Sequence, residues 1–178
     1  MHQPTQLLEK SECIHSAADV QAAISRLAHE ITHTLQHEKP VVMCVMGGGL
    51  VFAGQLMTAL NFPLELDYVH ASRYQNTTVG NTLHWQSMPK LDLKNRTVLL
   101  IDDILDEGIT LKEIQDKCLT LSAAKVYCAV LVEKTLPHAK PIHADFVGLQ
   151  VPNRYVFGCG MDAYGWWRNL PEIRALTL

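Results

Sequence analysis

The sequence lacks the marks of a membrane, secreted or nucleic-acid-coating protein. It has no apolar run of roughly 18 residues, the length that a membrane-spanning helix needs. The N-terminal stretch 1–6 lacks the basic region and small-residue cleavage site of a secretory signal, so we expect a cytoplasmic protein. Lys and Arg number 15 against 18 Asp and Glu, a formal net charge of -3. Because phosphate-dominated binding needs a basic surface, we expect no nucleic-acid partner and no membrane partner.

Clustered metal-binding or disulfide-forming residues are also missing. The five cysteines are odd in number and widely spaced, without any Cys-x-x-Cys pair, which indicates reduced thiols that mostly pack in the core. His29, His33 and His37 recur every fourth residue on one predicted helix face. That face lies opposite the apolar stripe of the helix, so the pattern favours a solvated surface over a metal site.

What the chain does have is an alternation of helical and strand patterns. Residues 16–36 predict a helix, which Ser16 can cap together with Asp19 three residues on. Strand-like runs follow at 41–46, 64–71, 97–102, 125–132 and 145–151, with helical spacing at 50–60 and 111–121. This order predicts an α/β fold, a central mainly parallel β-sheet flanked by helices, and the length of 178 residues predicts one domain over 1–178. Ligands of such sheets bind at the carboxyl ends of the strands.

Residues 72–88 are unlike an ordinary connector between strands. This long polar stretch is typical of a lid loop. Leu83, Trp85 and Met88 alternate in its second half, which indicates a small hairpin arm.

The segment 98–110 carries the strongest chemical signal. A buried strand delivers Asp102 and Asp103 at its carboxyl end, and Asp106 and Gly108 follow before a helix that begins near Thr110. The unpaired N–H groups of a helix start form an anion site, and glycine permits close backbone approach. Carboxylates beside such a phosphate cradle make sense if hydroxyls or Mg²⁺ lie between them. The plain alternative is a solvated acidic turn, which three acids within five residues make less favourable.

At these residues the chain resembles a known family. The order Asp-Asp-x-x-Asp-x-Gly-x-Thr after a hydrophobic strand resembles the phosphoribosyl pyrophosphate (PRPP) signature of type I phosphoribosyltransferases. The C-terminal part resembles the hypoxanthine-guanine phosphoribosyltransferases through 132–134, 145–148, 152–158, Asp162 and 167–171. The likeness runs from about residue 40 to 172. It implies the type I phosphoribosyltransferase fold, with a flexible lid loop over 72–88 and a small hood lobe formed by the N- and C-terminal segments.

The resemblance also implies an activity and its partners. Members of the family convert PRPP and hypoxanthine or guanine into IMP or GMP plus pyrophosphate, with Mg²⁺ as cofactor. They form homodimers or homotetramers, so a homo-oligomer is expected here.

For PRPP, the resemblance assigns roles residue by residue. The catalytic residue would be Asp106, similar to the carboxylate proposed to take the proton from purine N7. The ribose and 5′-phosphate would be bound by Asp102, Asp103, Asp106, Glu107, Gly108, Ile109 and Thr110. Glu107 stands where a hydroxyl residue is common, so we expect its side chain to point away from the phosphate.

Pyrophosphate and metal would meet residues from both ends of the chain. The resemblance assigns pyrophosphate to Gly47, Gly48, Gly49 and Arg168, with a non-proline cis peptide expected in the glycine loop. Many relatives carry Lys where this chain has Gly47. The Mg²⁺ ligands would be Asp162, Asp102 and Asp103.

The purine would be read by a separate set of residues. Lys134 resembles the lysine that donates to purine O6, which would reject adenine because adenine carries an amino group there. Tyr155 would stack on the base, and Val156 and Asp162 would complete its site. Arg73 and Tyr74 correspond to the lid pair of the family, where Ser-Tyr is common. Trp166 and Trp167 are expected to pack inside the hood.

Alternative functions remain open at this point. The main one is a regulatory protein of the same fold that senses PRPP or a nucleotide, although Lys134, Tyr155 and Arg168 favour catalysis. A phospho-receiver domain also places Ile-Asp-Asp at a strand end, but only about 75 residues follow, which is short of one ordinary domain. Xanthine-preferring and orotate-type transferases share the PRPP signature but fit the series from Lys134 to Arg168 less well.

Overall fold

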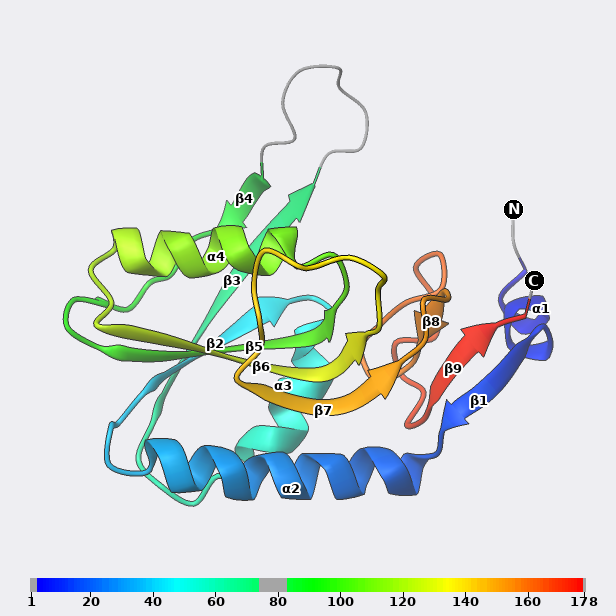
Figure 1. The fold of residues 1–178 in the computed structure, drawn as a ribbon, viewed down its shortest axis with the longest axis horizontal. Helices are drawn as coiled ribbons and strands as arrows, with labels where there is room; N and C mark the ends of the chain where they lie inside the picture. The colour runs from blue at the N-terminus through cyan, green and yellow to red at the C-terminus, as the bar shows by residue number, and fades with distance from the viewer. Residues whose placement is uncertain (1–2, 74–82, 178) are drawn as a thin grey trace.

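A computed structural model describes residues 3–73 and 83–177 (Figure 1). The helices are α1 Pro4–Glu9, α2 Ala17–Leu35, α3 Gly49–Met57 and α4 Ile109–Thr120. The strands are β1 Ser11–His15, β2 Val41–Met46, β3 Glu65–Arg73, β4 Leu83–Ser87, β5 Thr97–Leu105, β6 Lys125–Lys134, β7 Phe146–Val151, β8 Val156–Phe157 and β9 Ile173–Leu176. None of the helices in these ranges is long and apolar enough to cross a membrane.

The main sheet has six strands in the order β4-β3-β2-β5-β6-β7. All neighbours pair in parallel except β3 and β4, which form an antiparallel arm. The mainly parallel α/β sheet predicted from the alternation of elements is therefore confirmed. The antiparallel β4 also confirms the hairpin arm predicted in the second half of 72–88.

Helices cover both faces of this sheet, because successive strand residues point to opposite sides. Val42, Leu99 and Ile101 face α2 and α3, whereas Val98 and Leu100 face α4. In Figure 1, α4 lies above the sheet, and α2 and α3 lie below it. These two apolar layers hold the carboxyl ends of β2, β5 and β6 together at one edge of the sheet.

Helix α2 begins where its capping residues predict. The Ser16 hydroxyl accepts a hydrogen bond from the Asp19 N–H at 3.2 Å, and the Asp19 carboxylate accepts one from the Ser16 N–H at 2.8 Å. Hydrogen bonds from Ser16 lower the pKa of Asp19. His29, His33 and His37 lie on the exposed side of this helix or just after it, as predicted for a solvated face.

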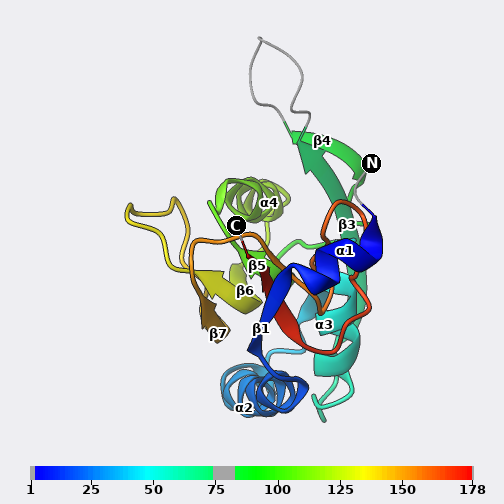
Figure 2. The same ribbon diagram turned by 90° about the vertical axis from the view of Figure 1, so that its right-hand side faces the viewer.

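A second, smaller sheet joins the two ends of the described chain. Its order is β1-β9-β8, and both pairings are antiparallel (Figure 2). Phe157 and Ala163 pack with Leu7 of α1 in a separate apolar cluster. We call residues 3–15 and 152–177 the hood. It stands at the carboxyl ends of β5 and β6, so its residues can face the loops that follow those strands.

Strand β5 is longer than predicted. The sequence pattern ended at residue 102, but β5 continues to Leu105 because Ile104 and Leu105 pair with Val132 and Glu133 of β6. The acidic signature therefore begins inside a strand. The expected lid falls partly on 74–82, which lie outside the described residues, and Tyr74 is among them.

Candidate active site

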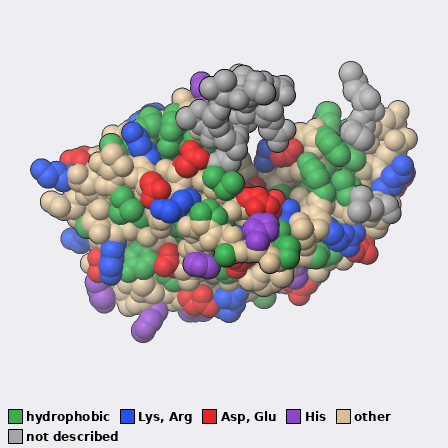
Figure 3. All heavy atoms as spheres, turned by 45° about the horizontal axis from the view of Figure 1, so that its top comes forward, with side chains coloured by type: hydrophobic (Ala, Val, Ile, Leu, Met, Phe, Trp, Pro, Cys, Tyr) green, Lys and Arg blue, Asp and Glu red, His purple; other side chains and the backbone are tan. Residues whose placement is uncertain are grey.

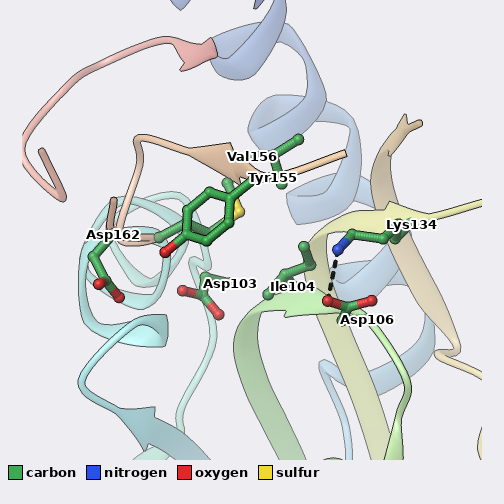
Figure 4. A pocket seen from close by; sticks show the side chains of 8 residues that line it. Asp103, Ile104, Asp106, Lys134, Tyr155, Val156 and Asp162 are labelled. Carbon is green, nitrogen blue, oxygen red and sulfur yellow. Dashed lines mark hydrogen bonds and ion pairs between the residues drawn. The ribbon is translucent and has the colours of Figure 1, made fainter. Parts of the chain in front are cut away.

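Two adjoining pockets lie at the carboxyl end of β5, and the smaller one lies between this end and the hood. The smaller has a volume of about 200 Å³ and is lined by Asp103, Ile104, Asp106, Lys134, Tyr155, Val156, Met161 and Asp162. The larger measures about 500 Å³ and runs over the signature from Asp102 to Leu111. Asp103, Ile104 and Asp106 line both pockets. Six of the residues that the sequence singled out thus meet in one small cavity (Figure 4).

Asp102 and Asp103 lie next to each other near the carboxyl end of β5, with Asp103 buried and Asp102 half-buried. The backbone N–H of Asp103 donates to the Asp102 carboxylate at 2.9 Å, and Asp103 is only 8% exposed. Burial, and then the neighbouring charge of Asp103, raise the pKa of Asp102 well above its ordinary value. Burial also raises the pKa of Asp103, partly offset by hydrogen bonds and by Arg168. Two carboxylates held this way favour a cation or a set of hydroxyl donors.

The signature loop leads directly into α4. Gly108 precedes the helix with a φ of 77°, a left-handed conformation that glycine adopts without strain. The first N–H groups of α4 have no intrahelical partners, so this turn suits an anion. The exposed carboxylate of Glu107 contacts Nε2 of His138 at 2.9 Å, in keeping with a side chain turned to solvent.

The glycine loop after β2 packs against the acidic pair. The Met46–Gly47 peptide bond is cis, as expected for this loop. A Cβ at Gly48 would clash with the carboxylate of Asp103, and one at Gly49 would lie 2.8 Å from the Ile101 carbonyl. Nothing lies within 4 Å of a Cβ built at Gly47. The backbone is therefore tight against β5 at Gly48 and Gly49 but open to a ligand at Gly47.

Asp162 and Arg168 lie on the hood and contact each other. The two side chains form an ion pair at 2.7 Å, and Arg168 also donates to the Gly160 carbonyl at 2.6 Å. The N–H of Gly165 donates to Asp162 at 2.7 Å. Arg168 lines neither pocket described above, and its guanidinium links two parts of the hood loop through these contacts.

Lys134 and Asp106 face each other across one end of the smaller pocket (Figure 4). Nζ of Lys134 lies 2.6 Å from Oδ2 of Asp106. The lysine side chain is 12% exposed and the aspartate side chain 45% exposed. A donor and an acceptor of opposite charge are thus held together at the junction of both pockets.

Tyr155 and Val156 form the opposite side of the smaller pocket. Val156 is held in β8 by its pairing with Ala175 of β9. Tyr155 stacks on Tyr164, with ring centroids 5.4 Å apart and an interplanar angle of 15°. Sequence reasoning missed Tyr164, because it belongs to a tight turn whose approach to Tyr155 is not local in the chain.

The remaining predicted residues lie at the end of β3 and in the hood. Arg73 is the last residue of β3, where it pairs with Leu83 of β4. Trp166 is 54% exposed, so its predicted place inside the hood is wrong, whereas Trp167 packs there and donates from its indole to the Pro4 carbonyl at 2.7 Å. The sequence analysis did not name Ile104, which lines both pockets. Because alternate residues of a strand lie on the same face, Ile104 shares a face with Asp102, and the extension of β5 to Leu105 makes this evident.

The described residues contain no group of three or more His, Cys, Asp or Glu side chains placed to share a metal ion. Asp102, Asp103 and Asp162 thus do not form a closed metal cage by themselves. Mg²⁺ commonly binds one or two carboxylates and completes its shell with water and substrate phosphates. This carboxylate set fits such a shared site.

On the face drawn in Figure 3, acidic and basic side chains are interspersed among the coloured residues.

Comparison with known proteins is consistent with this site. The phosphoribosyl transferase domain model matches residues 11–163. The hypoxanthine-guanine-xanthine phosphoribosyltransferase of Tritrichomonas foetus is 32% identical over 92% of this chain and 90% of its own length. The Bacillus subtilis hypoxanthine-guanine phosphoribosyltransferase is 32% identical over 90% of both chains. A solved hypoxanthine phosphoribosyltransferase from Staphylococcus aureus superposes with a TM-score of 0.89 at 25% identity, covering 99% of this chain and 97% of that one.

Proposed function

Because the chain belongs to the phosphoribosyl transferase family, and within it to the hypoxanthine-guanine phosphoribosyltransferases, we propose that it transfers the 5-phosphoribosyl group of PRPP to hypoxanthine or guanine. The products are IMP or GMP and pyrophosphate, which makes the protein a purine salvage enzyme. The relatives reported above carry enzyme names, and none of them supports the PRPP-sensing alternative.

The observation that carries this proposal is the position of Asp106. It lines both pockets and contacts Lys134. With the ribose of PRPP in the larger pocket and a base in the smaller one, Asp106 lies at the point where the new bond forms. There it takes the proton from purine N7, and its negative charge stabilises the oxocarbenium-like ribose.

Recognition of the base is assigned to the smaller pocket. Lys134 donates to purine O6, Tyr155 stacks on the ring, and Val156 and Asp162 meet the remaining edge. An adenine amino group would face the Lys134 ammonium, leaving two donors without an acceptor. The site therefore accepts 6-oxopurines and rejects adenine.

PRPP is assigned to the larger pocket and the glycine loop. Asp102 and Asp103 accept hydrogen bonds from the ribose hydroxyls, and residues 106–110 bind the 5′-phosphate at the start of α4. Pyrophosphate is bound by the Arg168 guanidinium and by the backbone at Gly47, Gly48 and Gly49. To reach it, Arg168 gives up part of its ion pair with Asp162.

Mg²⁺ fits the carboxylates at this site. Asp103 is buried, Asp102 is half-buried, and the pKa of each is raised, so a divalent cation would relieve their mutual repulsion, and Asp162 would hold a second ion on the hood side. The metal would neutralise the charge of the pyrophosphate leaving group.

We further propose that the chain works as one cytoplasmic domain and assembles as a homodimer or homotetramer. Leu50, Leu66 and Tyr68 are 54%, 54% and 38% exposed around one apolar hollow, a surface that a second copy would cover. Light scattering after size exclusion checks the assembly, and a monomer at micromolar concentration would contradict it.

The experiment that tests the function offers one base at a time with PRPP and Mg²⁺. Hypoxanthine, guanine, xanthine, adenine and orotate are assayed for nucleotide and pyrophosphate formation. Turnover of hypoxanthine and guanine with adenine refused supports the proposal. Binding of PRPP without turnover of any base would overturn it.

A further inference from the structure

The loop between β6 and β7 holds a lysine that the proposed chemistry does not use. The Lys140 side chain is only 7% exposed, although its ammonium is one of the groups that proteins rarely bury. It donates to the Leu105 carbonyl at 3.1 Å, to the Lys134 carbonyl at 2.6 Å and to the Glu133 carboxylate at 3.1 Å. All three protons of the ammonium therefore have an acceptor.

The three acceptors belong to the ends of the two strands that carry the proposed chemistry. Leu105 is the last residue of β5 and directly precedes Asp106, and Lys134 is the last residue of β6. The regular ladder between β5 and β6 ends at the pair Leu105 and Glu133. Lys140 thus continues the link between the strands at the level where Asp106 and Lys134 meet.

The counter-ion of Lys140 is itself held in place. Glu133 accepts a second hydrogen bond from Gln150 of β7 at 3.0 Å. Burial acts to raise the pKa of Glu133, but the hydrogen bonds from Gln150 and Lys140 outweigh it and leave that pKa below its ordinary value. The ammonium is therefore anchored to β7 as well as to β5 and β6.

Neighbouring residues of the same loop also contact the signature turn. His138 contacts Glu107, and a Cβ built at Gly108 would lie 3.0 Å from Ile142 and 3.6 Å from Lys140. His138, Lys140 and Ile142 are alternate residues, so one side of this segment follows the turn from 105 to 108.

We propose that Lys140 is a positioning residue that fixes the separation of Asp106 and Lys134, and with it the placement of the purine relative to the ribose. This proposal rests on the proposed function, because the purine and ribose are the ligands assigned above. Lys140 itself makes no contact with substrate in it. Without the ammonium, the carbonyls of Leu105 and Lys134 lose their shared donor and the two strand ends move independently.

The test compares three variants with the wild type. Lys140→Met alone leaves Glu133 with its hydrogen bond from Gln150 but without its counter-ion, so the informative variant is Lys140→Met with Glu133→Gln, which removes both charges. Lys125→Met is the matched control, because Lys125 is an exposed lysine at the opposite end of β6. Thermal unfolding and titration with PRPP give the folded and binding-competent fraction of each variant.

For the double variant we expect KM for hypoxanthine and guanine to rise at least fivefold and kcat per folded site to fall at least tenfold. The Lys125→Met control should match the wild type. A purely structural role would lower the folded fraction and leave both KM values and kcat per folded site unchanged, and that result would overturn the proposal. Failure of the proposed function is distinguishable, because it appears as absence of turnover in the wild type.

Discussion

Asp106 and Lys134 form an ion pair with each other, yet each has a separate task in the proposed reaction. The contact of 2.6 Å occupies one carboxylate oxygen and one ammonium proton. A 6-oxopurine can replace both partners at once, because it offers O6 as an acceptor to the lysine and the N7 proton as a donor to the aspartate. Adenine offers no acceptor at position 6, so the ion pair itself opposes its entry.

Asp106→Asn should separate binding from chemistry. The amide keeps the size of the side chain and can still contact the surroundings, but it cannot accept a proton, so we expect kcat to fall by about 10²–10⁴-fold. PRPP affinity should remain within a few-fold, because the backbone donors of 107–110 stay in place. Steady-state kinetics with hypoxanthine and calorimetric titration with PRPP measure the two effects. Equal losses of affinity and rate would contradict the role of Asp106 as the base.

The cysteines differ enough in exposure and pKa to be told apart chemically. Burial raises the pKa of Cys44, Cys118 and Cys159 to about 11 and that of Cys128 to about 12. At pH 8 a thiol with a pKa of 11 is ionised in roughly one molecule in a thousand, and the thiolate is the reactive form. Cys13 is exposed. We expect one fast-reacting thiol with a disulfide reagent in the native protein and five after unfolding, and a second fast thiol would show that the core opens readily.

At the scale of elements, the hood contacts the main sheet through the glycines of two loops. A Cβ at Gly160 would clash with the Gly48 carbonyl, and Gly48 itself packs on Asp103. The segment 158–165 also contains several residues with positive φ, among them Cys159 and Tyr164. Its shape is therefore set by close backbone approach to the glycine loop.

Gly160→Ala and Gly165→Ala form a matched pair that tests this contact. Both glycines have positive φ, 106° and 89°, but a Cβ at Gly165 would meet nothing within 4 Å. Gly165→Ala should lower the free energy of unfolding by about 1–2 kcal/mol, the usual strain of a left-handed residue, with activity retained. Gly160→Ala should add a displacement of the hood and raise KM for the base. Equal effects of the two substitutions on KM would show that the contact with Gly48 is unimportant.

Sequence patterns predicted the part of the site that is contiguous in the chain, and the family resemblance named Lys134, Tyr155, Val156 and Asp162, which line the smaller pocket. Asp102 to Thr110 follow one another as a strand, a turn and a helix start, so local patterns were sufficient to place them. The hood depends on contacts between distant segments. Tyr164 and Gly165 form the turn that joins Ala163 to Trp166, which places Trp166 on the surface, whereas its position before Arg168 predicted packing inside the hood. Lys140 lies in an irregular loop, where no periodicity indicates which side chains turn inward.

At the scale of the whole molecule, the acidic pair lowers stability in the absence of ligand. The pKa values of Asp102 and Asp103 are raised in the folded state, so the folded protein binds protons more tightly than the unfolded chain. Their contribution therefore becomes less favourable as pH rises above about 3.9, the ordinary aspartate value. At neutral pH the repulsion is present unless a cation compensates it.

Asp103→Asn should raise the Tm of the ligand-free protein and weaken its response to substrate. Removing one buried charge relieves the repulsion, and a gain of 1 kcal/mol corresponds to about 2–4 °C for a chain of this size. Mg²⁺ with PRPP at 100 times the dissociation constant should stabilise the wild type by about 2.7 kcal/mol and the variant by much less. Thermal scans with and without Mg²⁺ and PRPP measure both. A lower Tm for the ligand-free variant would contradict the repulsion.

The small sheet has a consequence for synthesis of the protein on the ribosome. β9, made last among the described strands, lies between β1, which is made first, and β8. Strands β2 to β7 and their helices can pack as soon as residue 151 has emerged, since their pairings need nothing beyond it. β1 and the base-reading backbone at Val156 must wait for residues 173–176. The nascent chain can therefore form the pocket over residues 102–111 before it completes the smaller pocket, which needs Tyr155, Val156, Met161 and Asp162 of the hood.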